Sequence, residues 1–165
     1  MTDLAEKARQ GDTEAFIELM NMNMQSMYKT AVAILKRDED TADAIQDTIL
    51  KCWENMGKLR KPEYFKTWMT KILVNNCRDR LRERQRTLPS DDIDMVSDEN
   101  DRYLNAEWRA SLESIEEKYR LILLLYYSDG YKTPEISKIL GIPEATVRTR
   151  LARGREKYLK SVEGK

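Results

Sequence analysis

Residues 64–86 read YFKTWMTKILVNNCRDRLRERQR, and their spacing predicts one long helix with two unlike faces. Apolar side chains recur three and four residues apart, which places them on one side of an α-helix that needs a core to pack against. These apolar residues are Phe65, Trp68, Met69, Ile72 and Leu73. Asn76 falls on the same side, so we expect it to cap or hydrogen-bond another segment of the chain.

The other side of this predicted helix carries hydrogen-bond donors and positive charge along one line. The stripe consists of Thr67, Lys71, Asn75, Arg78 and Arg82. Residues 60–86 hold nine Lys or Arg against three Asp or Glu, and such a surplus suits a phosphate backbone and the bases beside it. Taken alone, the pattern is more typical of an amphipathic helix with a solvated basic face, so the rest of the chain must distinguish the two interpretations.

Charge along the 165-residue chain divides into blocks, although the net charge is zero. The net charge is −4 over residues 1–59, +6 over 60–86, −8 over 87–117 and +6 over 118–165. Two basic blocks separated by an acidic one predict contact with a polyanion at two places.

The composition excludes several kinds of chemistry. Histidine is absent, and the two cysteines, Cys52 and Cys77, form no CxxC pair. The sequence therefore predicts reduced thiols, no metal site, no cofactor and no catalytic constellation. No apolar run approaches the roughly 20 residues that a transmembrane helix needs, and the N-terminus lacks a signal-peptide pattern. We expect a cytoplasmic protein that is not an enzyme.

Helical spacing also predicts helices over residues 2–10, 12–36 and 40–56, the second with Asp12 as its N-cap. The buried face expected for residues 40–56 consists of Ala42, Ile45, Ile49, Cys52, Trp53 and Met56. The opposite face places one leucine among acids, and consists of Asp43, Asp47, Leu50 and Glu54 with Gln46 at its edge. This pattern fits an incidental surface leucine and the centre of a protein interface equally well.

Two segments interrupt the helices. Pro62 makes residues 58–63 a loop, and residues 87–105, which are acidic and poor in apolar side chains, predict a flexible linker. The expected fold class is therefore all-α, with two small helical domains over residues 1–86 and 106–165 joined by the acidic linker.

The second predicted domain has the pattern of a helix-turn-helix. A buried helix over residues 117–127 ends in the run LILLLYY. Thr133 is the expected N-cap of the next helix, which reaches a turn at Gly141, and a last helix follows over residues 143–160. Two helices joined by a short glycine turn are typical of proteins that read the major groove of DNA.

The phase of the last helix predicts which of its residues face DNA. The inward stripe is Val147, Leu151, Gly154 and Tyr158. The outward stripe is Ala145, Thr149, Ala152, Arg153 and Glu156, flanked by Arg148. We expect Thr149 and Arg153 to contact bases or lie next to them, because arginine can bind guanine through two hydrogen bonds. Arg148 and Arg155 are the expected phosphate contacts.

Both predicted domains carry motifs of one protein family. Phe65-Lys66-Thr67-Trp68-Met69, followed by Ile72, Asn75 and Asp79, resembles the pattern F-x-T-W-L-x-x-I-x-x-N-x-x-x-D. Residues 42–47 (ADAIQD) resemble A-E-D-L-V-Q-E, and Glu135-Ile136, Gly141-Ile142-Pro143 and residues 146–155 resemble E-I-A…L-G-x-P-x-G-T-V-K-S-R-L-x-R-A-R. These patterns are those of bacterial extracytoplasmic-function (ECF) sigma factors of the sigma-70 family. Departures from the usual residues are Ala44, Met69, Ala145 and Gly154.

The resemblance implies an alternative sigma factor that binds RNA polymerase core and directs promoter-specific initiation of transcription. The residues implied to dock on the β′ clamp helices of the polymerase are Asp43, Gln46, Asp47 and Leu50. The implied contacts with the melted −10 promoter element are Lys61, Thr67, Trp68, Lys71, Asn75, Arg78 and Arg82. The implied −35 contacts are Ala145, Thr146, Arg148, Thr149, Arg153 and Arg155. Further implied partners are the polymerase β flap, promoter DNA and an anti-sigma factor, often membrane-anchored in this family.

The residues alone leave two other classes open. A free-standing helix-turn-helix regulator with an N-terminal sensor or dimerisation domain would share the second domain. A nuclease could bind metal through Asp38, Glu39, Asp40 and Asp43, but capping and the dipole at a helix N-terminus account for these acids.

Overall fold

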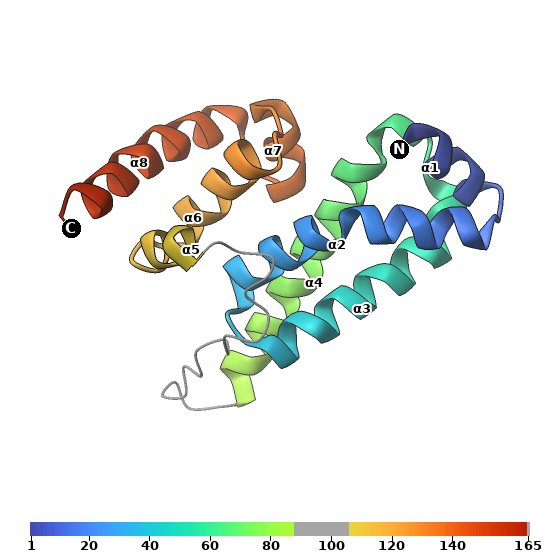
Figure 1. Cartoon of the computed structure of the whole chain (residues 1–165), viewed down its shortest axis with the longest axis horizontal. Coiled ribbons are helices and arrows are strands. Elements are labelled where there is room, and N and C mark those ends of the chain that lie inside the picture. The colour runs from blue at the N-terminus through green and yellow to red at the C-terminus, as the bar shows by residue number, and fades with distance from the viewer. Residues whose placement is uncertain (88–105, 165) are drawn as a thin grey trace. The chain divides into compact units, whose positions relative to one another are not determined.

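The computed structural model describes residues 1–87 and 106–164, and within these ranges it contains helices and connecting turns but no strand. The chain divides into two compact units, Met1–Asp94 and Met95–Lys165, and each is helical (Figure 1). The predicted all-α fold class is confirmed. Residues 88–105, which make up most of the predicted linker, lie outside the described residues.

The first unit is built from four α-helices. They are α1 (Thr2–Arg9), α2 (Thr13–Leu35), α3 (Asp38–Asn55) and α4 (Phe65–Thr87). Helices α2, α3 and α4 pack against one another, and α1 packs against α2 (Figure 1). Two short 3₁₀ turns, η1 (Met56–Lys58) and η2 (Pro62–Tyr64), occupy the predicted loop before α4. The predicted N-cap is confirmed, because the Asp12 carboxylate accepts a 3.0 Å hydrogen bond from the backbone N–H of Ala15.

The buried face of α3 differs from the prediction, and the predicted Ile49 is only half-buried. Ala42 and Trp53 are exposed, whereas Ala44 and Thr48 are fully buried beside Ile45 and Cys52. Small side chains at Ala44 and Thr48 allow α3 to pack closely against α4. The ring of Trp53 lies instead over Phe16 of α2, with 5.0 Å between ring centroids.

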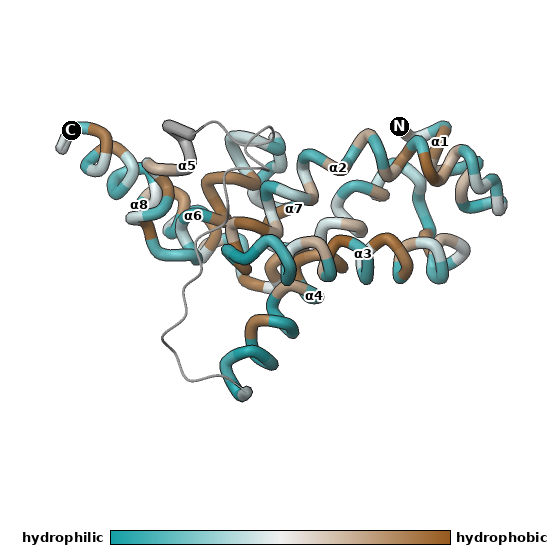
Figure 2. The backbone as a smooth tube through the Cα atoms, turned by 60° about the horizontal axis from the view of Figure 1, so that its bottom comes forward, coloured by the Kyte–Doolittle hydropathy of each residue, from teal (hydrophilic) through white to brown (hydrophobic). Residues whose placement is uncertain are grey.

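The second unit places a helix-turn-helix on a strongly apolar helix. Its elements are α5 (Ala106–Glu113), α6 (Glu117–Leu123), the π-helical turn η4 (Leu124–Ser128), α7 (Thr133–Leu140) and α8 (Glu144–Glu163). Residues 121–125 are all buried, as the sequence predicts, but Tyr127 is exposed. In Figure 2 both hydrophilic and hydrophobic colours occur along α6, whereas the C-terminal half of α4 is mostly hydrophilic.

A glycine turn and a side-chain hydrogen bond join the two helices of the helix-turn-helix. Gly141 follows α7 with φ +67°, a left-handed conformation that glycine adopts without steric strain. The predicted N-cap of α7 is wrong by one residue: Lys132 holds that position, and Thr133 begins the helix. The Thr133 hydroxyl instead donates to the Glu144 carboxylate of α8 at 2.9 Å. This bond joins the two helices of the motif.

Candidate functional site

The outward face of α4 presents the polar stripe that the sequence predicts. Lys71, Asn75 and Arg82 are exposed, and Thr67 and Arg78 are half-buried. Among the described residues Arg82 pairs with Asp79 of its own helix at 3.4 Å, and both side chains are about two-thirds exposed. The helix therefore leaves donors and positive charge in solvent along one line.

Aromatic residues border this stripe at the start of α4. Trp68 is half-buried, and its ring packs on Phe65 with 5.9 Å between centroids. Lys61, in the loop before α4, is exposed and places its ammonium group 5.7 Å from the centroid of the Tyr64 ring. Flat rings beside cations are the elements of sites that stack unpaired bases.

Two other arginines of α4 turn toward α3. Arg80 donates to the Asp47 carboxylate at 2.5 Å and lies 3.6 Å from that of Asp43. Arg84 donates to Asp40 at 3.0 Å and to the Leu35 carbonyl at 3.4 Å. The hydrogen bond with Asp47 is the main cause that raises the pKa of Arg80. Sequence reasoning missed both pairs, because their partners lie 33 and 44 residues earlier in the chain.

The four residues predicted to dock on a protein partner share one region of α3. Leu50 is 56% exposed, Gln46 is exposed, and the carboxylates of Asp43 and Asp47 are about half exposed. The predicted arrangement of one leucine among acids is therefore present on the surface. Arg80 of α4 forms ion pairs with both carboxylates, so their positions depend on α4.

A polar chain fixes α3 against α4 beneath this surface. The Lys51 ammonium group donates to the Asn76 side-chain oxygen at 2.6 Å. The Asn76 amide donates to the Thr48 hydroxyl at 3.0 Å, and that hydroxyl donates to the Ala44 carbonyl at 2.7 Å. The prediction that Asn76 hydrogen-bonds another segment is confirmed. The predicted docking face and the polar stripe therefore belong to one packed pair of helices.

Helix α8 has the phase that the sequence predicts. Val147, Leu151 and Gly154 are buried, and the outward stripe is exposed. The exposed residues are Ala145, Arg148, Thr149, Ala152, Arg153 and Glu156, with Thr146 half-buried beside them. A Cβ atom at Gly154 would lie 3.2 Å from Cγ of Leu123, so glycine allows α8 to approach α6 closely.

The polar groups of α8 differ in how firmly they are held. Arg148 lies 3.5 Å from the carboxylate of Glu144, and the Thr149 hydroxyl donates to the Ala145 carbonyl at 3.0 Å. Arg153 forms no hydrogen bond or ion pair with the described residues. Its guanidinium group is free to bind a ligand.

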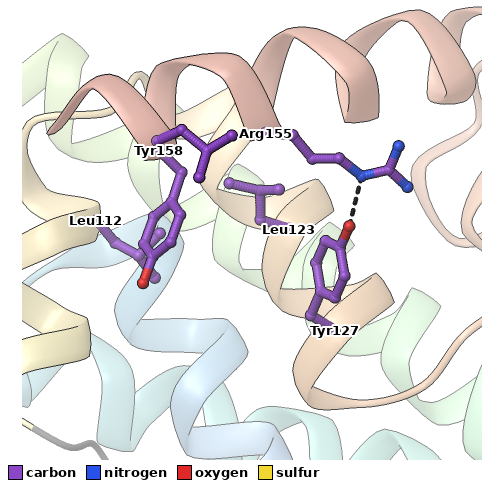
Figure 3. A pocket seen from close by; sticks show the side chains of 6 residues that line it. Leu112, Leu123, Tyr127, Arg155 and Tyr158 are labelled. Atoms are coloured by element: carbon purple, nitrogen blue, oxygen red, sulfur yellow. Dashed lines mark hydrogen bonds between the residues drawn. The ribbon is translucent and has the colours of Figure 1, made fainter. Parts of the chain in front are cut away.

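Arg155 is anchored within its own unit. Its Nε donates to the Tyr127 hydroxyl, and its guanidinium carbon lies 5.7 Å from the ring centroids of both Tyr126 and Tyr127. Figure 3 shows the bond at the edge of a mainly apolar pocket of about 310 Å³ between α6 and α8. The pocket is lined by Leu112, Leu123, Tyr127, Arg155, Tyr158 and Leu159.

Both thiols lie in the core of the first unit. Cys52 and Cys77 are fully buried, and burial raises the pKa of each to about 12. They are inert at neutral pH, because the thiolate is the reactive form. The described residues contain no group of three or more His, Cys, Asp or Glu side chains that could hold a metal ion.

Comparison with known proteins assigns both units to one family. A family model described as Sigma-70 region 2 matches residues 19–87, and one described as Sigma-70, region 4 matches residues 106–157. The chain is 29% identical to the RNA polymerase sigma factor SigV of Bacillus subtilis over 150 residues, which cover 89% of this chain and 90% of that protein. It is also 29% identical to the ECF RNA polymerase sigma-E factor of Escherichia coli K12, with 93% and 89% covered.

The chain belongs to the ECF group of the sigma-70 family. The fold of this sigma factor agrees with that assignment. CnrH, solved in complex with the cytosolic domain of CnrY, matches with a TM-score of 0.72 at 21% identity over 99% of this chain and 97% of that one. The sigma factor RpoE of Bartonella quintana, solved with the anti-sigma factor NepR, matches with a TM-score of 0.73 at 17% identity over 92% and 98%.

The matched regions of the sigma factor contain all the predicted contact residues. Region 2 spans α2 to α4, with the acidic face of α3 and the stripe of α4, whereas region 4 spans α5 to most of α8. Helix α1 precedes the matched part of region 2. None of the described helices of the sigma factor is long and apolar enough to cross a membrane.

Proposed function

We propose that this chain is an alternative sigma factor whose first unit binds RNA polymerase core and a melted −10 element, while its second unit binds the −35 element as duplex DNA. The observation that carries the proposal is the pair of exposed polar stripes, one on α4 and one on α8, each within its matching sigma-70 region. Two separate basic helices suit two promoter elements better than one continuous site.

The docking face for the polymerase is the acidic region of α3. Leu50 supplies exposed apolar area, and Asp43, Gln46 and Asp47 supply a polar rim around it. Interfaces between proteins combine an apolar centre with such a rim. Because Arg80 holds both carboxylates from α4, docking and −10 binding use one packed pair of helices.

The −10 contacts lie on α4 and on the loop before it. Lys71, Asn75, Arg78 and Arg82 can bind the backbone of a single strand, while Thr67, Trp68 and Lys61 lie at the end where bases can stack. Duplex opening costs about 1–2 kcal/mol per base-pair step in lost stacking. One helix with a few polar contacts does not offset several such steps, so specific opening requires the polymerase core.

The −35 contacts lie on α8. On this helix, Arg153 is exposed and has no partner among the described residues, and it is the base-reading candidate, with Thr149 beside it. Ala145 and Thr146 allow close approach to the groove, and Arg148 and Arg155 bind phosphates.

The second unit also has a surface for the polymerase β flap. Leu159 and Tyr127 both line the apolar pocket, and each is 57% exposed. We assign the flap to this pocket because a concave apolar surface between helices suits an inserted apolar side chain. An anti-sigma factor is a further partner of the chain, since RpoE and NepR form such a complex.

The docking face can be tested with two variants. Asp47→Lys combined with Leu50→Ala should lower the affinity for polymerase core at least 100-fold, because it removes the apolar centre and reverses one rim charge. Leu50→Ala alone should lower the affinity for polymerase core about tenfold, because the ion pairs of Arg80 stay intact. Ile17→Ala is the matched control, since Ile17 is an exposed aliphatic residue on α2. Binding is measured by fluorescence anisotropy, with circular dichroism to verify folding.

Opening of the promoter separates this function from that of a free-standing regulator. The isolated chain should bind promoter duplex weakly and with little sequence preference, and −10 thymines should react with permanganate only after core is added. If the Asp47→Lys/Leu50→Ala variant bound polymerase core as tightly as wild type, the docking surface would have to lie elsewhere on the chain. Nanomolar, sequence-specific binding of the chain alone to closed duplex would favour the regulator.

A further inference from the structure

The side chain of Arg9 connects the first helix to the loop that precedes α4. Arg9 is the last residue of α1, and its guanidinium group donates to the backbone carbonyls of Leu59 at 3.3 Å and Arg60 at 3.2 Å. The other terminal nitrogen of the guanidinium lies 2.8 Å from both carboxylate oxygens of Glu6, one turn earlier in α1. Gln10 donates to the same carboxylate at 3.0 Å. The guanidinium group is therefore held on both sides.

The two carbonyls that Arg9 binds lie between the two 3₁₀ turns η1 and η2. The 3₁₀ turns on either side close through their own backbone bonds, Leu59 N–H to Met56 at 3.2 Å and Tyr64 N–H to Lys61 at 3.0 Å. Within the described residues, the carbonyls of Leu59 and Arg60 accept from no backbone N–H. Arg9 supplies the donor that they otherwise lack, and so fixes the two peptide planes directly before Lys61.

The residues that follow these planes belong to the −10 surface. Lys61 is extended, with φ −128° and ψ 114°, and its ammonium group lies over the ring of Tyr64, which is 52% exposed. A rotation of either preceding peptide plane would displace both side chains relative to α4. Geometry of this kind decides whether a base is discriminated or merely bound.

We propose that Arg9 is a positioning residue for −10 recognition: by binding the carbonyls of Leu59 and Arg60, it sets the loop so that Lys61 and Tyr64 receive an unpaired base. This inference rests on the proposed function of the first unit. It assigns a role in promoter selection to α1, which lies outside residues 19–87 of the region 2 match. The fork of the guanidinium group is essential, because a lysine ammonium group cannot bridge two carbonyls and a carboxylate in this geometry.

The test uses the full chain bound to polymerase core, and fork-junction DNA with a single-stranded −10 segment. The wild-type complex first selects the sequence of that segment from a random pool, and the selected DNA is then the probe for each variant. Arg9→Ala should weaken binding to the selected probe about tenfold, the value of one lost charge-assisted contact. Discrimination against single-base changes in the probe should fall by a similar factor. Affinity for core should not change. Arg9→Lys should recover folding and charge but not base discrimination.

The matched control is Lys7→Ala, which removes an exposed cation of α1 that pairs with Asp3 of the same helix at 3.3 Å. It should leave both affinity and discrimination unchanged. If Arg9→Ala fails to fold, Arg9→Lys carries the test. Equal discrimination in Arg9→Lys and wild type overturns the inference. The inference is also overturned if Arg9→Ala weakens binding equally to all sequences and reduces the salt dependence by the amount expected for about one phosphate contact. Arg9 would then bind DNA directly. Failure of wild type to select any −10 sequence refutes the proposed function itself.

Discussion

The two units have different interiors, and the difference extends to their basic helices. The first unit buries many polar side chains among its apolar ones, namely Asn23, Thr30, Thr41, Thr48, Thr70 and Asn76. In the described part of the second unit, leucine and isoleucine dominate the core, and Arg120 is its buried polar residue. In the first unit, ion pairs join α4 to α3, whereas in the second unit Gly154 brings α8 close to Leu123 of α6.

This comparison shows that the net charge of a segment differs from the charge it offers to DNA. Residues 60–86 have a surplus of six positive charges. Arg80 and Arg84 are paired with acids of α3, so they hold the unit together rather than face solvent. On α8, Arg153 faces solvent without a partner among the described residues. The number of cations that can bind phosphate is therefore smaller on α4 than its sequence indicates.

The largest expected effect is a loss of stability of the first unit in alkali. Burial raises the pKa of Cys52 and Cys77 to about 12, and both thiols belong to this unit. A raised folded pKa stabilises the native state fully below the unfolded value near 8.5, and this contribution is lost as pH rises toward 12. At pH 10.5 the loss should be about 2–3 kcal/mol per thiol. Urea unfolding at pH 7.5 and 10.5 measures it.

The control for the alkaline loss is the double variant Cys52→Ala/Cys77→Ala. It should be less stable at pH 7.5, because it loses packed volume, but its stability should fall less between the two pH values. An identical pH dependence in variant and wild type would assign the loss to tyrosine or lysine instead. The second unit has no cysteine after residue 95, so its unfolding should lack this contribution.

A smaller effect is expected at the −35 surface. Arg153→Ala should weaken promoter binding by the polymerase complex by about 1–3 kcal/mol and relax the preference at one or two −35 bases. Arg148→Ala should weaken binding to all sequences equally, because a phosphate contact positions without reading bases. Binding to a set of promoters with each −35 base changed distinguishes the two. Unchanged base preference in Arg153→Ala would remove this residue from the base-reading set.

The elements that sequence could predict are those fixed by neighbouring residues. The N-cap Asp12, the turn at Gly141 and the phase of α8 depend on a few adjacent side chains, and the structure confirms each. The prediction for the buried face of α3 was wrong at Ala42 and Trp53: Ala44 and Thr48 are buried instead, and the Trp53 ring lies on Phe16 of α2.

Long-range partners explain what the sequence could not predict. The acids that bind Arg80 and the carbonyls that bind Arg9 lie more than 30 residues away in the chain, so no local pattern indicates them. The π-helical turn at residues 124–128, which brings Tyr127 to Arg155, likewise has no sequence signal that we recognise. The predicted contacts with polymerase and promoter stay predictions, since they depend on molecules outside the chain.

The smallest expected effect separates two arginines of α4 that are two residues apart. The Arg84 side chain is 26% exposed and donates to Asp40 and to the Leu35 carbonyl, whereas the Arg82 side chain is 65% exposed. Arg84→Ala leaves a half-buried carboxylate and a carbonyl without this donor, so it should lower the free energy of unfolding by about 1 kcal/mol. Arg82→Ala should change it by less than about 0.5 kcal/mol, because exposed pairs contribute little.

The same two variants should rank in the opposite order when DNA is bound. A phosphate can displace Asp79 from Arg82 at little cost, and each phosphate neutralised on a single strand adds about 0.7 to the slope of log K against log salt. Arg82→Ala should reduce that slope by about this amount with fork-junction DNA and polymerase core, and Arg84→Ala should leave it unchanged. A reduced slope in Arg84→Ala would mean that its ion pair with Asp40 opens when DNA binds. The distinction between cations that hold the unit together and cations that bind DNA would then fail on α4.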